Sequence, residues 1–343
     1  MMAATPVSLE LPWLLGVTTC ASVVGVSVAE SLRKAFGDYA KSQQKTKFKE
    51  KKRRWRTLNE FINYMLTAFI LVVTSFDKSL LLTAGYPMLW YAFTYVLCIL
   101  LSDVYSSCFP SPLSPLQQNW HRISNAAYLT NNNTIILNTK VPHNRLYGLY
   151  KSVLEYFKLS LPSLIGQFLG LHLGIFWLKI MWGKVLTSYH QENIHVFDKC
   201  LPSFKTNTIV EGFVIEFLCT MLFLMFSKFI SIISENSSSA KGRSLLNPFK
   251  YALFRKVINN LFVILLLFIF LDVTGCYANP FLAYAVQQNC LTSSKNWFIF
   301  MIVYFSGPLL ATITFCGFIE PELSSRLASM FEKAKQFAAN KQK

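Results

Sequence analysis

The sequence predicts an all-α protein that crosses a membrane several times. Of its 343 residues, 53% are hydrophobic and 15% are charged, whereas soluble proteins carry about a quarter charged residues. Long runs free of Asp, Glu, Lys and Arg approach the roughly 20 residues that a helix needs to cross the hydrocarbon layer. Helices are expected because backbone polar groups in lipid must be paired within their own segment. The uncharged segments are residues 11–29, 61–76, 80–102, 159–178, 257–271 and 296–319, and a further apolar segment, residues 208–233, carries Glu211, Glu216 and Lys228.

The position of the positive charge predicts the topology. The net charge is +16, and in a soluble protein such a value favours nucleic acid as a partner. Here most Lys and Arg lie between apolar segments, and positively charged loops stay in the cytoplasm. We therefore expect six spans between residues 58 and 319 with both ends of that unit cytoplasmic, and no nucleic-acid partner. The basic segments are residues 33–56, 120–151, 231–256 and 320–343, whereas residues 77–87, 183–206 and 272–295 are poor in Lys and Arg.

The two ends of the chain lie outside this six-span unit. Residues 1–33 are expected to be an extra N-terminal hydrophobic segment, joined to the unit by a basic cytoplasmic linker over residues 34–57. A basic flank that follows the apolar run favours an uncleaved anchor over a cleaved signal peptide. Residues 321–343 are expected to form a polar, helical, cytoplasmic tail.

A faint internal repeat divides the spanning unit. Residues 60–66 read EFINYML and residues 216–222 read EFLCTML, and each copy opens a hydrophobic helix. Each copy is followed by a second apolar stretch and then by a short segment that contains proline. Because three spans per copy is an odd number, the second copy is expected upside down, with a functional site near the bilayer midplane. The predicted repeats are residues 58–182, with pore loop 108–118, and residues 207–320, with pore loop 274–290.

The strongest local signal is Asn279-Pro280-Phe281, directly after an apolar run. Asn caps free N–H groups and Pro suits the first helical turn. The following residues are therefore expected to form a half-helix whose positive end faces the midplane. Such an end orients water by its oxygen and repels cations. An ordinary Asn-Pro turn is the alternative, because Asn247-Pro248-Phe249 repeats the tripeptide in a basic loop.

Residues Thr274-Gly275-Cys276-x-x-Asn279-Pro280 resemble the second pore loop of the aquaporin family. The resemblance implies a bundle of six transmembrane helices and two re-entrant half-helices, assembled as a homotetramer with one pore per subunit. It also implies roles for single residues. They are loop bracing by the buried acids Glu60 and Glu216, close helix crossings at Gln167-x-x-Gly170 and at Gly307-Pro308, and a mercury-reactive thiol at Cys276.

Where the sequence departs from the usual family pattern, it resembles the unorthodox branch of the family. This branch, the superaquaporins, contains aquaporins eleven and twelve. The first pore motif reads Phe109-Pro110-Ser111, and Cys290 follows Asn279 by eleven residues. Leu282 stands where orthodox members carry an Arg at the constriction, which favours less polar solutes such as glycerol or hydrogen peroxide. Bulky rings at Phe109 and Phe281 narrow the expected pore or close it. A disulfide between Cys200 and Cys290 is also compatible with the predicted topology.

Three functional hypotheses follow. The first is a passive channel for water or small neutral solutes, and the second is a non-conducting structural membrane protein plugged by Phe109 and Phe281. The third is a proton-coupled transporter that uses Glu60 and Glu216, since acids within apolar segments are costly. The sequence contains no nucleotide loop, metal pattern or catalytic constellation, so neither enzyme activity nor a cofactor is expected. The endoplasmic reticulum membrane is the expected location, with the plasma membrane as the alternative.

Overall fold

A computed structural model places helices throughout the part of the chain that it describes. The elements of the described residues are helices, with no strand among them, which confirms the expected all-α class. Phe109 and Pro110 lie outside these residues, as does most of the expected span over residues 80–102. The described residues are 11–44, 49–83, 111–120, 123, 145–194, 208–239, 252–270 and 273–341.

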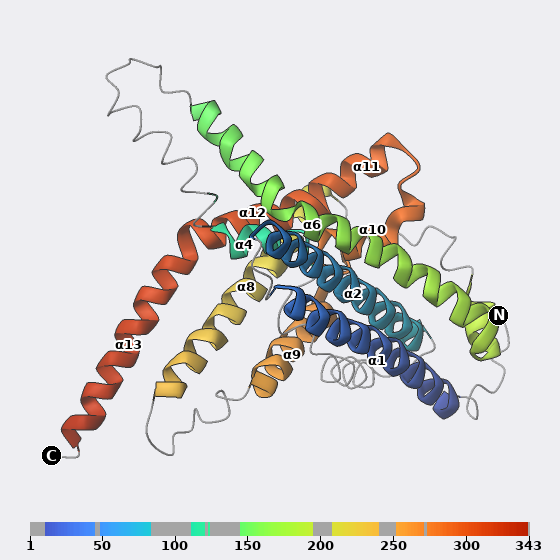
Figure 1. Cartoon of the computed structure of the whole chain (residues 1–343), viewed down its shortest axis with the longest axis horizontal. Coiled ribbons are helices and arrows are strands. Elements are labelled where there is room, and N and C mark those ends of the chain that lie inside the picture. The colour runs from blue at the N-terminus through green and yellow to red at the C-terminus, as the bar shows by residue number, and fades with distance from the viewer. Residues whose placement is uncertain are drawn as a thin grey trace.

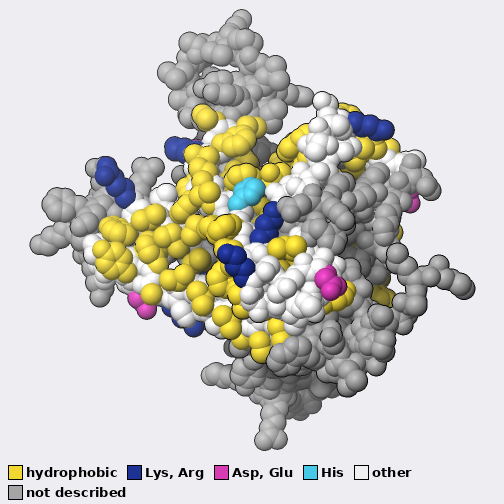
Figure 2. Space-filling view, turned by 90° about the vertical axis from the view of Figure 1, so that its right-hand side faces the viewer, with side chains coloured by type: hydrophobic (Ala, Val, Ile, Leu, Met, Phe, Trp, Pro, Cys, Tyr) yellow, Lys and Arg dark blue, Asp and Glu magenta, His cyan; other side chains and the backbone are white. Residues whose placement is uncertain are grey.

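Four helices in the described residues are long and apolar enough to cross a membrane. These candidate spans are Arg54–Phe76, Val153–Val185, Ile209–Ser234 and Ser294–Leu327, with Val257–Phe270 as a shorter apolar helix. Figure 2 shows a surface on which hydrophobic side chains gather with few Lys or Arg among them. These features are typical of an all-α membrane protein, as predicted. The spans belong to α2 (Lys49–Thr83), α6 (Arg145–Ile180), α8 (Ile209–Ser239), α9 (Ala252–Phe270) and a continuous helical stretch from α11 (Ser294–Phe300) to α13 (Glu320–Lys341).

Helix α1 (Leu11–Gln44) lies along α2 (Figure 1). Val26 and Ala29 pack against Leu66 and Ile70, whereas Tyr39, nearer the end of α1, contacts the ring of Trp55 at a centroid distance of 5.3 Å. The two helices are therefore antiparallel. Helix α1 continues past the expected apolar segment, so the basic linker predicted over residues 34–57 is largely helical instead of an open connection.

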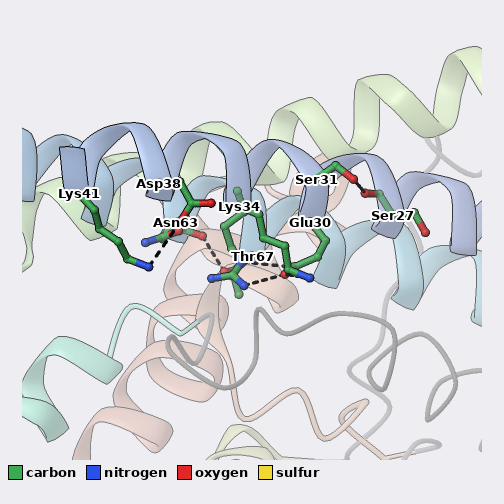
Figure 3. Close-up of polar contacts among 9 residues, drawn as sticks. Ser27, Glu30, Ser31, Lys34, Asp38, Lys41, Asn63 and Thr67 are labelled. Atoms are coloured by element: carbon green, nitrogen blue, oxygen red, sulfur yellow. Dashed lines mark hydrogen bonds and ion pairs between the residues drawn. The ribbon is translucent and has the colours of Figure 1, made fainter. Parts of the chain in front are cut away.

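The polar side chains of α1 form local contacts (Figure 3). Glu30 is buried, and its carboxylate pairs with Arg33 at 2.7 Å and with Lys34 at 3.5 Å. A buried charge is tolerated when it is paired and hydrogen-bonded. Glu30 therefore allows the polar end of α1 to remain packed against α2.

The side chain of His190, on the short helix α7 (Ser188–Glu192), contacts α1. The His190 ring is fully buried, with Nε2 at 3.2 Å from the Thr18 hydroxyl and Nδ1 at 2.8 Å from the Thr187 hydroxyl. It also contacts the Trp182 ring edge-on. Burial lowers the pKa of His190 to about 4, so the ring is neutral at physiological pH.

Helices α2 and α6 cross with their backbones almost in contact. A Cβ atom added to Gly166 would meet the carbonyl of Phe61, and one added to Gly170 would meet the carbonyl of Met65. Small residues permit this approach. A side chain at either position would push α2 and α6 apart.

Two short helices pack among these long helices. Helix α4 (Ser114–Gln118) contacts α6 and α12 (Gly307–Thr314), and α10 (Pro280–Gln287) contacts α6 and α2. Ala285 of α10 lies in a core cluster with residues of α2 and α6, including Val73 and Leu171. Conversely, Trp120, just after α4, packs against a core of α8 and the C-terminal helices that includes Met221 and Phe315. Each short helix thus contacts long helices from the other half of the chain.

Two π-helical segments flank α12, namely η6 (Met301–Ser306) and η7 (Phe315–Ile319). Pro308 has no N–H, so it cannot donate to the carbonyl four residues earlier, and such sites loosen the regular helical pattern. The helix nevertheless continues through η7 into α13, the polar C-terminal tail. Lys228 of α8 pairs with Glu320 at 2.9 Å where this tail begins.

Candidate functional site

The carboxylate of Glu216 organises the loop over residues 273–279. Glu216 is fully buried on α8. One of its oxygens accepts hydrogen bonds from the Thr274 hydroxyl at 2.8 Å and from the Tyr277 N–H at 3.2 Å, and the other accepts from the Ala278 N–H at 3.0 Å. Charge-assisted bonds of this kind are stronger than neutral ones. The acid therefore fixes the loop through two of its backbone amides and one side chain.

The loop has an unusual backbone. Gly275, Cys276 and Ala278 have φ values of +87°, +44° and +47°. These values lie in the left-handed region, which is unfavourable for residues other than glycine. Such conformations persist only where the surroundings impose them. Here the Glu216 carboxylate and a bond from the Tyr304 hydroxyl to the Thr274 carbonyl, at 2.9 Å, impose them.

Helix α10 begins directly after this loop. Asn279 is the N-cap, and its side-chain oxygen accepts from the Phe281 N–H at 3.0 Å, while Pro280 occupies the first turn. Asn279 and Pro280 are both buried. The predicted Asn-Pro helix start thus lies inside the protein, whereas the tripeptide at residues 247–249 lies outside the described residues.

Aromatic side chains surround one face of α10. The ring of Phe281 lies 6.5 Å from that of Phe168 on α6, and Tyr284 lies 6.0 Å from Phe168 and 6.1 Å from His172. Phe281 is half-buried, and so is its neighbour Leu282. The side chains beside the start of α10 are therefore mostly aromatic or aliphatic.

A similar hydrogen bond occurs at Ser111, in the turn that leads into α4, although Leu113, the N-cap of α4, makes no side-chain cap bond. The Ser111 hydroxyl accepts from the Leu113 N–H at 3.3 Å, two residues ahead, as Asn279 does for Phe281. Gln167 Nε2 donates to the Ser111 carbonyl at 3.2 Å, and the Tyr156 hydroxyl donates to the Pro112 carbonyl at 2.8 Å. Ser111-Pro112 therefore lies just before Leu113, the N-cap of α4, whereas Asn279-Pro280 is itself the N-cap and first residue of α10. The predicted motif began two residues earlier, at Phe109.

Glu60 does not take the position that the sequence repeat assigned to it. Its side chain is about half exposed and pairs with Arg56 at 3.8 Å, one turn earlier on α2. It is therefore not placed like Glu216, and its predicted loop-bracing role needs correction.

The two helix crossings show which residue corresponds to Glu216. Gly166 lies against Phe61 and Met65, and Gly307 lies against Phe213 and Phe217 with the same four-residue spacing. The residue three positions after Phe61 is Tyr64 in α2, and the residue three positions after Phe213 is Glu216 in α8. Tyr64 therefore corresponds to Glu216. Tyr64 is buried, and its hydroxyl lies 3.4 Å from the side chain of Gln118 at the end of α4. The sequence repeat is therefore one helical turn out of register with the crossings.

Comparisons with models of protein families, with curated proteins and with solved structures find no match. The geometry of the two loops therefore carries the functional argument by itself.

Sequence reasoning missed Tyr64 and Pro112. Pro112 offered a signal, because Ser111-Pro112 pairs a capping residue with a proline just as Asn279-Pro280 does. Tyr64 lay inside the matched heptapeptide but was hidden by the identical Glu that begins each copy.

Proposed function

We propose that the protein is a passive transmembrane channel of the aquaporin type for water or small neutral solutes. One observation carries the proposal. A fully buried carboxylate, Glu216, holds a strained loop from which an Asn-capped helix, α10, enters the packed helices of the other half of the chain. Irregular backbone at the depth of a membrane is tolerated where it is buried in protein or lines a water-filled cavity.

The second loop supports an inverted arrangement of two half-helices. Ser111 and Asn279 each accept a hydrogen bond from the N–H two residues later, Asn279 as the N-cap of α10 and Ser111 in the turn that leads into α4. Each short helix contacts helices of the opposite half. The positive ends of two such helices disfavour cations at the point where they meet. We therefore propose these two dipeptides, and not Phe109-Pro110, as the tips of the pore loops.

The side chains near α10 favour weakly polar solutes. Phe281 and Leu282 follow the capping Asn279, and Phe168 lies beside Phe281. An apolar constriction without a cationic side chain imposes a smaller desolvation penalty on neutral glycerol or hydrogen peroxide than on ions. Glycerol and peroxide are therefore the solutes that we propose besides water.

The acids do not favour proton-coupled transport. Glu60 is exposed and paired with Arg56, whereas Glu216 is buried and already accepts three hydrogen bonds. A proton relay needs acids that exchange partners along a path, and Glu216 serves instead as a fixed acceptor. The proposed role of Glu216 is therefore to brace the second pore loop.

A non-conducting structural protein is the second candidate, because Phe281 is large and packs with Phe168. Phe109, its proposed partner in a plug, lies outside the described residues. Replacing Phe109 and Phe281 together by Ala discriminates the two candidates. A plugged protein would gain a solute flux that the native chain lacks, whereas an open channel already conducts.

The assembly and the location are also proposals. A homotetramer in an intracellular membrane, such as the endoplasmic reticulum, is consistent with the resemblance of the pore loop. Cys290 is disulfide-bonded, and disulfides form in the lumen of the endoplasmic reticulum or outside the cell. This bond favours a non-cytoplasmic position for the loop after α10, in agreement with the topology expected from the basic segments.

Stopped-flow light scattering of proteoliposomes tests the proposal. Vesicles containing the protein are expected to swell or shrink faster than empty vesicles in gradients of water or glycerol, and a trapped dye is expected to report faster peroxide entry. The same rates as empty vesicles for all three solutes would exclude the channel. Glu211→Gln, an exposed change on the same helix, is the matched control for variants of Glu216.

A further inference from the structure

Positive charge is concentrated where α1 ends and α2 begins. Residues 41–56 contain nine Lys and Arg and a single acid, Glu50. The described side chains at the two ends of this basic segment, Lys41 of α1 and Arg56 of α2, are 79% and 71% exposed. The proposed pore uses none of these charges.

An aromatic contact between the two helices fixes the level of this charge. The Trp55 ring lies 5.3 Å from the ring of Tyr39 and 6.4 Å from that of Phe36. Because α1 and α2 are antiparallel, Lys41 lies on the same side of this contact as the start of α2. Trp and Tyr are typical of the membrane interface, and the candidate span of α2 begins at Arg54. We therefore expect the basic segment just outside the hydrocarbon layer.

The basic start of α2 is short enough to stay within the headgroup layer of one leaflet. Residues 49–54 rise by about 8 Å along a helix, and the headgroup region on one side of a bilayer is about 5–7 Å thick. The alternation of basic and uncharged segments predicts that this end is cytoplasmic, and the cytoplasmic leaflet carries anionic lipids. The basic segment is therefore expected at the depth of anionic headgroups.

The charges at this level are paired only weakly within the protein. Lys41 Nζ lies 3.7 Å from Asp38 (Figure 3), and Arg56 Nε lies 3.8 Å from Glu60. Exposed pairs of this kind contribute little to stability, so a phosphate group can replace either carboxylate. The basic residues deeper along α1 differ, because they share the buried carboxylate of Glu30.

We propose that the end of α1 and the start of α2 form a docking surface for the anionic phospholipids of the cytoplasmic leaflet. Clusters of about four to eight Lys or Arg beside a membrane helix attract such lipids. Arg also binds phosphate oxygens through two parallel hydrogen bonds. Bound headgroups would reduce the repulsion within the basic segment and hold the α1–α2 pair at the membrane surface. This inference does not depend on the proposed channel function.

Native mass spectrometry of the full-length protein in detergent, titrated with lipid, tests the docking surface. We expect phosphatidylserine to bind more tightly than phosphatidylcholine, and a higher concentration of ammonium acetate to reduce this preference by screening. Each Lys or Arg near an anionic surface contributes about fivefold to binding. Loss of four charges is therefore expected to weaken phosphatidylserine binding by at least about tenfold. The test variant combines Lys49→Gln, Lys51→Gln, Lys52→Gln and Arg53→Gln.

Two matched variants show whether local charge is responsible. The first keeps the charge of the basic segment and is expected to keep the native preference; it combines Lys49→Arg, Lys51→Arg and Lys52→Arg. The second removes four charges from the segments expected on the opposite side of the membrane and should leave both affinities unchanged. This control combines Lys184→Gln, Lys199→Gln, Lys205→Gln and Lys295→Gln.

Several results would overturn the docking surface. They are equal affinities of the native protein for the two lipids, a native preference in the test variant, and binding of glycerophosphoserine, which lacks acyl chains, as tight as that of the whole lipid. Tighter binding of a single-stranded DNA oligonucleotide than of phosphatidylserine would assign the surface to nucleic acid instead. Thermal unfolding in phosphatidylcholine micelles shows whether each variant is folded, and Lys51→Gln with Lys52→Gln provides a milder substitution.

Discussion

Replacing Glu216 by Gln is expected to destabilise the loop that starts α10. The side-chain volume hardly changes, but one carboxylate oxygen becomes an NH₂ group. If the remaining oxygen keeps the bonds from Thr274 and Tyr277, the Ala278 N–H, now 3.0 Å from its acceptor, faces another donor. If the amide is flipped, Thr274 and Tyr277 lose their acceptor instead. Either orientation leaves a buried donor unpaired.

The magnitude follows from the number of bonds. A hydrogen bond to a charged group contributes about 1.5–3 kcal/mol, and an unpaired buried donor costs about 1–3 kcal/mol. We therefore expect Glu216→Gln to lower the free energy of unfolding by about 3 kcal/mol, which for a protein of this size is a fall of several degrees in Tm. Glu211→Gln, exposed on the same helix, is expected to change stability by less than about 0.5 kcal/mol.

Thermal unfolding of the purified proteins, followed by intrinsic fluorescence, measures the difference. Stopped-flow swelling then shows whether the weakened loop still forms a pore, and we expect the rate to fall in Glu216→Gln only. Equal Tm values and equal swelling rates for the two variants would refute the assignment of Glu216 as the residue that fixes the loop.

Three further substitutions test other contacts. Gly170→Ala should separate the crossing helices and lower stability by about 1–3 kcal/mol, whereas Gly37→Ala, whose added Cβ would make an ordinary contact at 4.0 Å from Asn59 Oδ1, should be neutral or stabilising; thermal unfolding compares them. Asn279→Ala should cost about 1 kcal/mol as a lost cap and also reduce swelling rates, whereas Ser293→Ala, which removes the cap of α11, should cost stability but leave swelling unchanged. Burial holds the pKa of His190 at about 4, below the value of about 6.5 in the unfolded chain. The unfolded state therefore gains a proton first, and stability should fall by up to about 3 kcal/mol as the pH drops from 6.5 to 4; a similar fall in His190→Gln, measured by thermal unfolding, would contradict this.

The sequence was sufficient to predict the all-α class and the capped helix start in the second loop. Uncharged runs predict membrane helices because the cost of charge in lipid is large, and Asn279-Pro280 predicts a capped helix start from local chemistry alone. Both inferences depend on short-range physics that a single segment contains.

The first loop and its bracing residue were predicted less well, because they depend on how helices cross. The identical Glu60 and Glu216 suggested one register, whereas the close contacts of Gly166 and Gly307 give another, displaced by one turn. No local pattern in residues 60–66 indicates that Tyr64 and not Glu60 faces inward. The left-handed backbone of the second loop likewise depends on its contacts with Glu216 and Tyr304, which the composition of the loop alone does not specify.

An experimental structure of the protein in a lipid nanodisc tests the central claim most directly, through the positions of Pro112 and Pro280. We predict that both prolines lie at the same depth near the middle of the bilayer, with the starts of α4 and α10 facing each other across one pore. Prolines exposed on the same membrane surface, or separated by packed helices, would contradict a channel built from these two loops.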